Sequence, residues 1–93
     1  MTEQQKELIT KEAEDILHNE QIVNTLVSLK GRWADECEYE DFSEYVDVVK
    51  NVVESQGYKF VKLTKTFALT LIGKHFTYMI KFNGVYLTVT LVK

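Results

Sequence analysis

Apolar residues recur every three or four positions in the first part of the chain. Between residues 3 and 18 this spacing predicts an amphipathic helix. Thr2 and Gln5 have the spacing of a capping box, which would satisfy backbone N–H groups at the start of this helix. Asn19 follows the helix and suits both the end of the first helix and the cap of a second.

A second apolar stripe runs from Ile22 to Leu29 and predicts another helix. Gly31 lies two residues after this stripe, where a glycine that ends a helix is expected. Residues 32–40 show no clear period. We therefore expect them to form a loop or a short helical turn.

The third stripe is the most regular of the chain. Six apolar residues between Phe42 and Val53 fall on one helical face. Asp41 and Glu44 have the spacing of a second capping box. These features predict a helix over residues 41–57, with Gly57 at its end.

In the second half of the chain apolar and polar positions alternate, which is typical of β-strands. Asn83–Gly84 separates two alternating runs and favours a two-residue hairpin turn. This turn pairs Phe82 with Val85 on an apolar face and Lys81 with Tyr86 on the opposite face.

A two-residue turn at Gly73–Lys74 is consistent with the same apolar face. It pairs Leu71 with Phe76, so two separate turns predict one register.

The first strand is predicted over residues 58–63, followed by a three-residue loop at 64–66. In this register Val61 and Leu63 point toward the apolar face. The outward side chains are then those of Tyr58, Phe60 and Lys62.

A sheet with one apolar face must be covered, and only the three amphipathic helices can cover it. The sequence therefore predicts an α+β fold in which three N-terminal helices pack on one face of a C-terminal antiparallel β-meander of three to four strands. At 93 residues the chain forms a single domain, 1–93. The last strand carries no charge before Lys93, so a homodimer through this sheet edge is a further expectation.

Charge changes this picture because it is segregated along the chain. The formal net charge of -3 divides into -9 over residues 1–54 and +6 over residues 55–93, where every charged residue is a lysine. The helical layer, residues 1–57, is thus expected to be acidic and the sheet, residues 58–93, basic. Such asymmetry bears on binding partners rather than on the fold.

The sequence lacks the motifs of common catalytic and cofactor sites. His18, Cys37 and His75 do not have metal-ligand spacing, and the acidic neighbours of Cys37 disfavour a reactive thiolate. No glycine-rich phosphate loop is present. We therefore expect a protein that is not an enzyme and has no metal or cofactor.

The apolar pattern also bears on location. No run approaches the length of a membrane span, and the first ten residues lack the apolar core of a secretion signal. We expect a cytoplasmic protein without membrane contact. The small, proline-free chain is compatible with a viral or mobile-element accessory protein, in which case the location is the host cytoplasm.

Residues 35–47 hold seven acidic residues, no basic residue and three aromatic rings. Acidic side chains with exposed rings can steer and anchor a basic protein. We therefore predict a non-enzymatic interaction module, acting as an inhibitor or regulator of a basic partner. The expected partner-binding residues are Trp33, Glu38, Tyr39, Glu40, Asp41, Glu44 and Asp47. A merely solvated helix surface remains the competing interpretation.

The alternative function is nucleic-acid binding by the outer face of the sheet. Cationic side chains combined with rings on an open sheet are typical of single-strand binding. The residues expected to contribute are Lys62, His75, Lys81 and Tyr86. The near absence of arginine and the acidic helices make this alternative less favoured.

Overall fold

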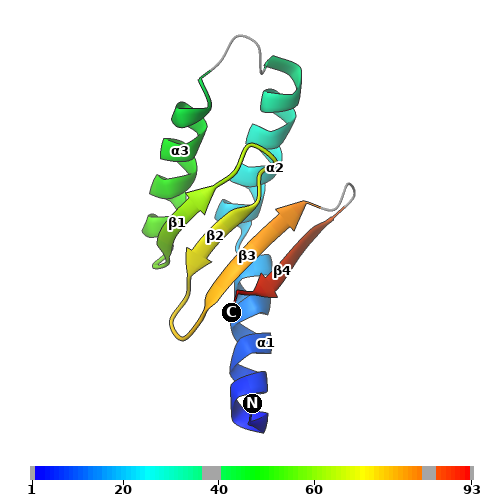
Figure 1. Cartoon of the computed structure of the whole chain (residues 1–93), viewed down its shortest axis with the longest axis vertical. Helices are drawn as coiled ribbons and strands as arrows, with labels where there is room; N and C mark the ends of the chain where they lie inside the picture. Colours follow the sequence, from blue (N-terminus) through cyan, green and yellow to red (C-terminus); the bar gives the residue numbers. More distant parts are fainter. Residues whose placement is uncertain (1, 37–40, 83–85, 93) are drawn as a thin grey trace.

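The computed structural model describes residues 2–36, 41–82 and 86–92 and confirms the predicted α+β arrangement (Figure 1). Three helices precede four strands. Their bounds are α1 Glu3–Leu17, α2 Glu20–Glu36, α3 Phe42–Ser55, β1 Lys59–Leu63, β2 Leu69–Ile72, β3 Thr77–Phe82 and β4 Leu87–Leu91. The strands form one antiparallel sheet in the order β1-β2-β3-β4, as expected for a meander.

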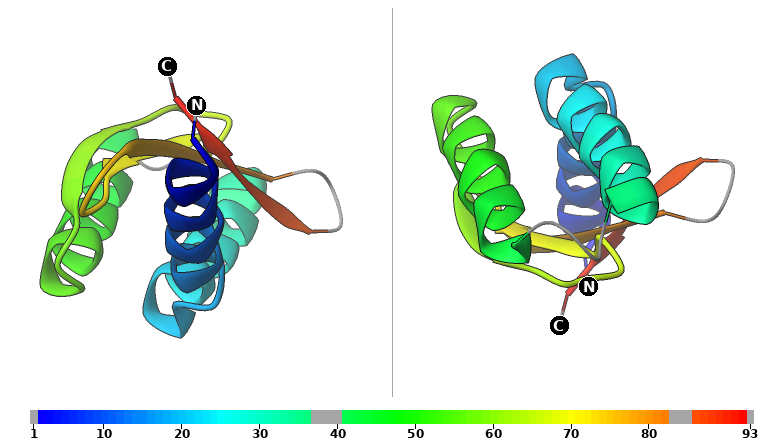
Figure 2. Two further views of the ribbon diagram at one scale, coloured as in Figure 1. Left: turned by 90° about the horizontal axis from the view of Figure 1, so that it is seen from below. Right: turned by 90° about the horizontal axis from the view of Figure 1, so that it is seen from above.

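All three helices lie on the same side of the sheet (Figure 2). Helix α1 packs against β4, helix α3 packs against β1, and α2 packs against α3. The fully buried core therefore lies between the helical layer and the apolar face of the sheet. Its largest side chains are those of Ile16, Ile22, Leu26, Phe67, Leu69, Leu71, Tyr78 and Ile80. Within the described residues, no helix is long and apolar enough to cross a membrane.

The start of α1 and the junction with α2 follow the sequence pattern. The Thr2 hydroxyl accepts a bond from the Gln5 backbone N–H at 3.2 Å, and the Thr2 N–H donates to the Gln5 side chain at 3.0 Å. The Asn19 side chain accepts from the backbone N–H of Ile22 at 3.2 Å. The capping box and the capping of α2 by Asn19 are confirmed, whereas the C-cap of α1 is His18 rather than Asn19.

Helix α2 does not end at Gly31 but continues to Glu36, so residues 32–36 are helical and the predicted helix end at Gly31 is wrong. A glycine inside a helix costs only about 1 kcal/mol relative to alanine. Packing offsets this cost, because the Trp33 ring in the last turns of α2 meets the rings of Phe42 and Tyr45 on α3. Residues 37–40 of the predicted loop lie outside the described part of the chain.

Helix α3 begins and ends close to the predicted residues. The Asp41 side chain caps it by accepting from the Ser43 backbone N–H at 3.0 Å. Gln56 is the C-cap, and Gly57 follows with a φ of +89°, a conformation that glycine adopts without steric cost.

Both predicted hairpin registers are displaced by two residues. Leu71 pairs with Tyr78 rather than with Phe76, and Phe82 pairs with Leu87 rather than with Val85. Four residues therefore separate each pair of strands, and the predicted two-residue turns are wrong. The residues Asn83–Gly84 themselves lie outside the described part of the chain. Because two is an even shift, the predicted apolar face is nevertheless preserved.

Strand β1 departs from the prediction at a bulge between Phe60 and Lys62. Val61 is 46% exposed rather than inward, whereas Leu63 is buried as expected. Phe60 and Tyr58, both predicted to face outward, pack against the core. The bulge adds a residue to one side of the ladder, and alternation cannot be extended through such an insertion.

The connection from β1 to β2 is longer than the predicted three-residue loop. Thr64 holds it together, because its N–H donates to the Ala68 carbonyl at 3.1 Å and its carbonyl accepts from Phe67 at 2.8 Å. Phe67 has a φ of +61°, which is strained for a bulky residue. Its ring is buried against Phe42 and Tyr45, so this turn is fixed by core packing.

Candidate functional site

The described part of the acidic segment lies mainly on α3. Asp41, Glu44 and Asp47 are all exposed, as a binding role requires. The predicted contributors Glu38, Tyr39 and Glu40 lie outside the described residues. The candidate surface can therefore be built only on the part of the segment carried by the helix.

Asp41 has a structural role that the other two acids lack. The hydrogen bonds from Ser43, first from its backbone and then from its side chain, lower the pKa of the Asp41 carboxyl. This favours the charged form of the N-cap, whose negative charge also suits the helix N-terminus. The presence of Asp41 is thus explained without a partner. Glu44 also lies in the first turn of α3, where the helix N-terminus favours negative charge, so Asp47 is the more informative acid.

Val48 lies beside these two acids and is 45% exposed. It is four residues after Glu44 and directly follows Asp47, so the three side chains share the solvent-facing part of α3. We call Glu44, Asp47 and Val48 the acidic face. Within the described residues, neither Glu44 nor Asp47 takes part in an ion pair or hydrogen bond that would occupy its carboxylate.

Val48 was not among the residues predicted from the sequence, although a signal for it exists. The apolar stripe of this helix contains Val46, Val49, Val52 and Val53, and Val48 falls outside it. An apolar residue outside the buried stripe of an amphipathic helix is expected on the surface.

Trp33, predicted as a partner anchor, is half-buried in an aromatic cluster. Its ring centroid lies 4.9 Å from that of Phe42 and 5.5 Å from that of Tyr45, both in edge-to-face geometry. Phe67 completes the cluster from the β1–β2 connection, 5.5 Å from Phe42. Trp33 thus packs α2 against α3, which accounts for its ring without a partner.

The residues of the nucleic-acid alternative are not brought together. Lys62 and Lys81 are exposed on the outer face of the sheet, but His75 lies in the β2–β3 connection. Tyr86 does not pair with Lys81, because Thr88 takes that place. The outward positions of the described strands carry lysine, threonine and aliphatic side chains without a ring for base stacking.

Tyr86 instead lines a groove on the helical side, where its side chain is 59% exposed. This groove was not predicted, because Tyr86 lies in the connection before β4 rather than in a strand, so strand alternation does not determine its side of the sheet. Its volume is about 460 Å³, and it is lined by Leu17, Val23, Val27, Phe82, Tyr86 and Leu87. The Lys30 ammonium borders it, 4.6 Å from the centre of the Phe82 ring.

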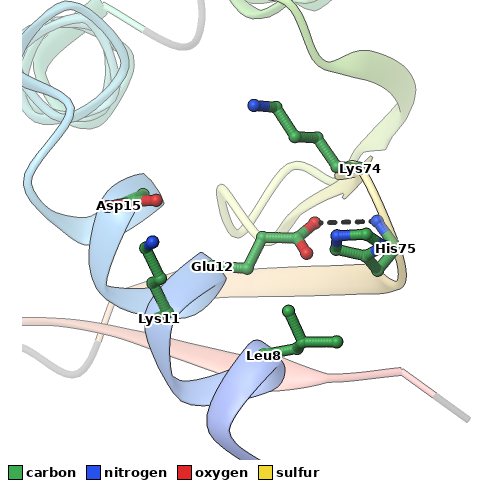
Figure 3. A pocket seen from close by; sticks show the side chains of 6 residues that line it. All are labelled: Leu8, Lys11, Glu12, Asp15, Lys74 and His75. Atoms are coloured by element: carbon green, nitrogen blue, oxygen red, sulfur yellow. Dashed lines mark hydrogen bonds between the residues drawn. The ribbon is translucent and has the colours of Figure 1, made fainter. Parts of the chain in front are cut away.

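A buried carboxylate was also not predicted from the sequence. Glu12 of α1 is only 6% exposed and points at the β2–β3 connection (Figure 3). Its Oε1 atom accepts from the His75 backbone N–H at 3.2 Å. Gly73 makes room for it, since a Cβ atom at Gly73 would lie 1.8 Å from Glu12 Oε1. These contacts attach α1 to the turn between β2 and β3.

The Glu12 carboxylate also acts on a neighbouring phenol. Burial, and after it the Glu12 charge, raises the pKa of Tyr78 to about 12. A small pocket of about 180 Å³ lies beside Glu12 and includes Lys11, Asp15 and Lys74 (Figure 3). Acidic and basic groups are mixed around it, so the pocket has no consistent preference for an anion or a cation.

Within the described residues, no three histidine, cysteine or carboxylate side chains are grouped as metal ligands. The features that remain for function are thus the acidic face and the apolar groove. Comparison of the chain with protein-family models, with curated proteins and with solved structures finds no match.

Proposed function

We propose that this protein is a non-enzymatic interaction module that binds a basic protein partner through the acidic face of α3. The observation that carries the proposal is the position of exposed Val48 beside two exposed carboxylates, Glu44 and Asp47. Carboxylates increase the rate of encounter with a basic surface, whereas a buried apolar contact slows dissociation. If the partner binds its own ligand through the same basic surface, the acidic face competes with that ligand and inhibits the partner.

The lysines of the sheet support the proposed function because they lie on the side of the sheet opposite to α3. Lys59, Lys62 and Lys81 lie on the outer face of the sheet, whereas α3 covers the inner face. A basic partner approaching Glu44 and Asp47 therefore meets these carboxylates before it meets the lysines of the sheet, although α3 itself carries the exposed Lys50. Within about 8 Å, the screening length in physiological salt, local charges determine the interaction.

The proposal is tested by reversing the charge of the acidic face. The variant E44K/D47K should lose the partner from a native lysate, since both carboxylates are replaced by cations. The matched control is E7K/E14K, which makes the same change in net charge on exposed positions of α1. Asp41 is kept in both variants because it caps α3.

The contribution of Val48 is tested separately with V48S. This variant keeps both carboxylates and should accelerate dissociation of the captured partner with little effect on the association rate. An unchanged dissociation rate would remove Val48 from the proposed surface.

The nucleic-acid alternative has its own measurement. If the alternative is correct, fluorescence anisotropy at low salt should detect binding of single- or double-stranded probes through Lys62 and Lys81. The affinity should then fall steeply as the salt concentration rises. Binding that disappears in K62A/K81A would favour this alternative over the acidic face.

A further inference from the structure

The two edges of the sheet are built differently. Edge strand β1 carries Lys59 and Lys62 and is interrupted by the bulge at Val61. Lysines and bulges are the devices by which proteins keep sheet edges from pairing. Edge strand β4 has neither, because its residues are Leu87, Thr88, Val89, Thr90 and Leu91 and its pairing with β3 is regular.

The hydrogen bonds between β3 and β4 determine which backbone groups of β4 point to its outer edge. The N–H of Val92 donates to the carbonyl of Thr77 at 2.9 Å, so residue 92 faces β3. Bonding directions alternate along an antiparallel strand, and Thr88 and Thr90 therefore also face β3. The N–H and C=O groups of Leu87, Val89 and Leu91 point to the outer edge, where the described residues provide no strand partner (Figure 1).

The apolar side chains of β4 are also incompletely covered. Leu87, Val89 and Leu91 are half-buried, whereas Leu69 and Leu71 of the central strand β2 are fully buried. Helix α1 packs against β4 and covers part of its inner face. An additional strand beside β4 would cover these side chains further.

The sequence of β4 identifies the strand that fits this edge. LTVTL reads the same in both directions, with Val89 at its centre. In an antiparallel pair of identical strands centred on Val89, each Leu87 lies opposite a Leu91, and each Thr88 lies opposite a Thr90. No charged residue meets a like charge, and a two-fold symmetric contact of this kind closes as a dimer.

We infer that two copies of this chain associate through β4, forming a continuous eight-stranded antiparallel sheet across a two-fold axis at Val89. The register follows from the backbone, because only the odd-numbered residues of β4 present hydrogen-bonding groups to the partner. Pairs of Thr88 with Thr90 of the second copy are then the close, non-hydrogen-bonded pairs. This association leaves α3 free, since α3 lies against β1 at the opposite edge.

The first test uses charged residues on the outer face of β4, where they do not enter the core. In T88K/T90K, two pairs of lysines meet across the axis, and the association constant measured by sedimentation equilibrium should fall about tenfold or more. In T88E/T90K each glutamate lies opposite a lysine of the second copy, so dimerisation should be retained. The control V61K adds a lysine to the exposed bulge of β1 and should leave association unchanged.

The second test reads the register directly, with Cys37 replaced by serine. A mixture of the T88C and T90C variants should form a disulfide between the two copies on mild oxidation, because these positions lie opposite each other. T88C alone should form little, since its two cysteines are then offset along the strands. A wild-type chain that stays monomeric at the highest concentration, or a T88K/T90K variant that dimerises as well as wild type, would overturn the inference.

Discussion

Gly31 and Gly73 illustrate how differently the surroundings of a single residue can constrain it. A Cβ atom on Gly31 would meet no atom within 4 Å, whereas one on Gly73 would collide with Glu12 Oε1. Gly31 is exposed in the interior of α2, where glycine lowers helix stability through its large conformational freedom in the unfolded chain. A side chain at Gly73 would require the Glu12 carboxylate to move.

We therefore predict that G31A raises the free energy of unfolding by roughly 0.5–1 kcal/mol, because alanine fits the space and favours the helix. The matched variant G73A should lower it, since the added methyl group displaces the Glu12 carboxylate. Urea denaturation of both variants measures the two changes. Equal effects of the two substitutions would contradict the assignment of Glu12 to the β2–β3 turn.

The buried phenol of Tyr78 leads to a second prediction for a single residue. Its pKa is 10.0 in the unfolded chain and about 12 in the folded protein. Between these values the unfolded chain releases the phenol proton and the folded protein keeps it, so the free energy of unfolding should fall as pH rises through this window. Below pH 10 both states hold the proton, and this contribution is fully present.

The measurement compares urea denaturation of wild type and Y78F in steps of pH through the same window. Y78F lacks the titrating group, and its stability should fall less steeply with pH. Identical slopes would show that the Tyr78 phenol does not carry the effect.

At the level of elements, the starts of α1 and α3 followed from local chemistry, whereas the end of α2 and the strand registers did not. Capping by Thr2 and Asp41 depends on residues two or three positions away, which the sequence displays directly. The β2–β3 connection instead contacts a residue far away in the sequence, because the His75 N–H donates to Glu12 of α1, and local alternation does not show such a contact. Alternation determines which face of a strand is buried, but shifts of two residues leave that face unchanged.

The same distinction explains the candidate site. Glu44 and Asp47 could be placed on a helix from the sequence, and Val48 could have been placed beside them because it lies outside the apolar stripe. The position of Tyr86 could not be obtained, since it lies in the connection before β4, where strand alternation does not determine the side of the sheet. The continuation of α2 past Gly31 likewise depends on the contact of Trp33 with α3.

The contact between α2 and α3 at Trp33 leads to a prediction about stability. W33A removes the edge-to-face contacts with Phe42 and Tyr45 and should lower the free energy of unfolding by about 3 kcal/mol. W33F keeps a ring in the cluster and should lower it less. Denaturation followed by far-UV circular dichroism measures both, and a W33A variant as stable as wild type would contradict the packing role.

At the scale of the whole molecule, the small net charge conceals two separated charge distributions. The exposed acids of α3 lie on the helical side of the sheet, and the lysines of β1 and β3 lie on its outer face. Like charges within each layer repel one another modestly, and the lysines of β1 also protect that edge from pairing. Binding to a basic partner through α3 and pairing of two copies through β4 use different surfaces and can occur together.

The most direct test of the central claim is partner capture by three folded proteins compared at equal concentration: wild type, E44K/D47K and E7K/E14K. Circular dichroism first establishes that all three are folded. The acidic face predicts that wild type and E7K/E14K retain the same partner, identified by mass, and that E44K/D47K loses it. Retention of that partner by E44K/D47K would contradict the claim, as would an equal loss in E7K/E14K.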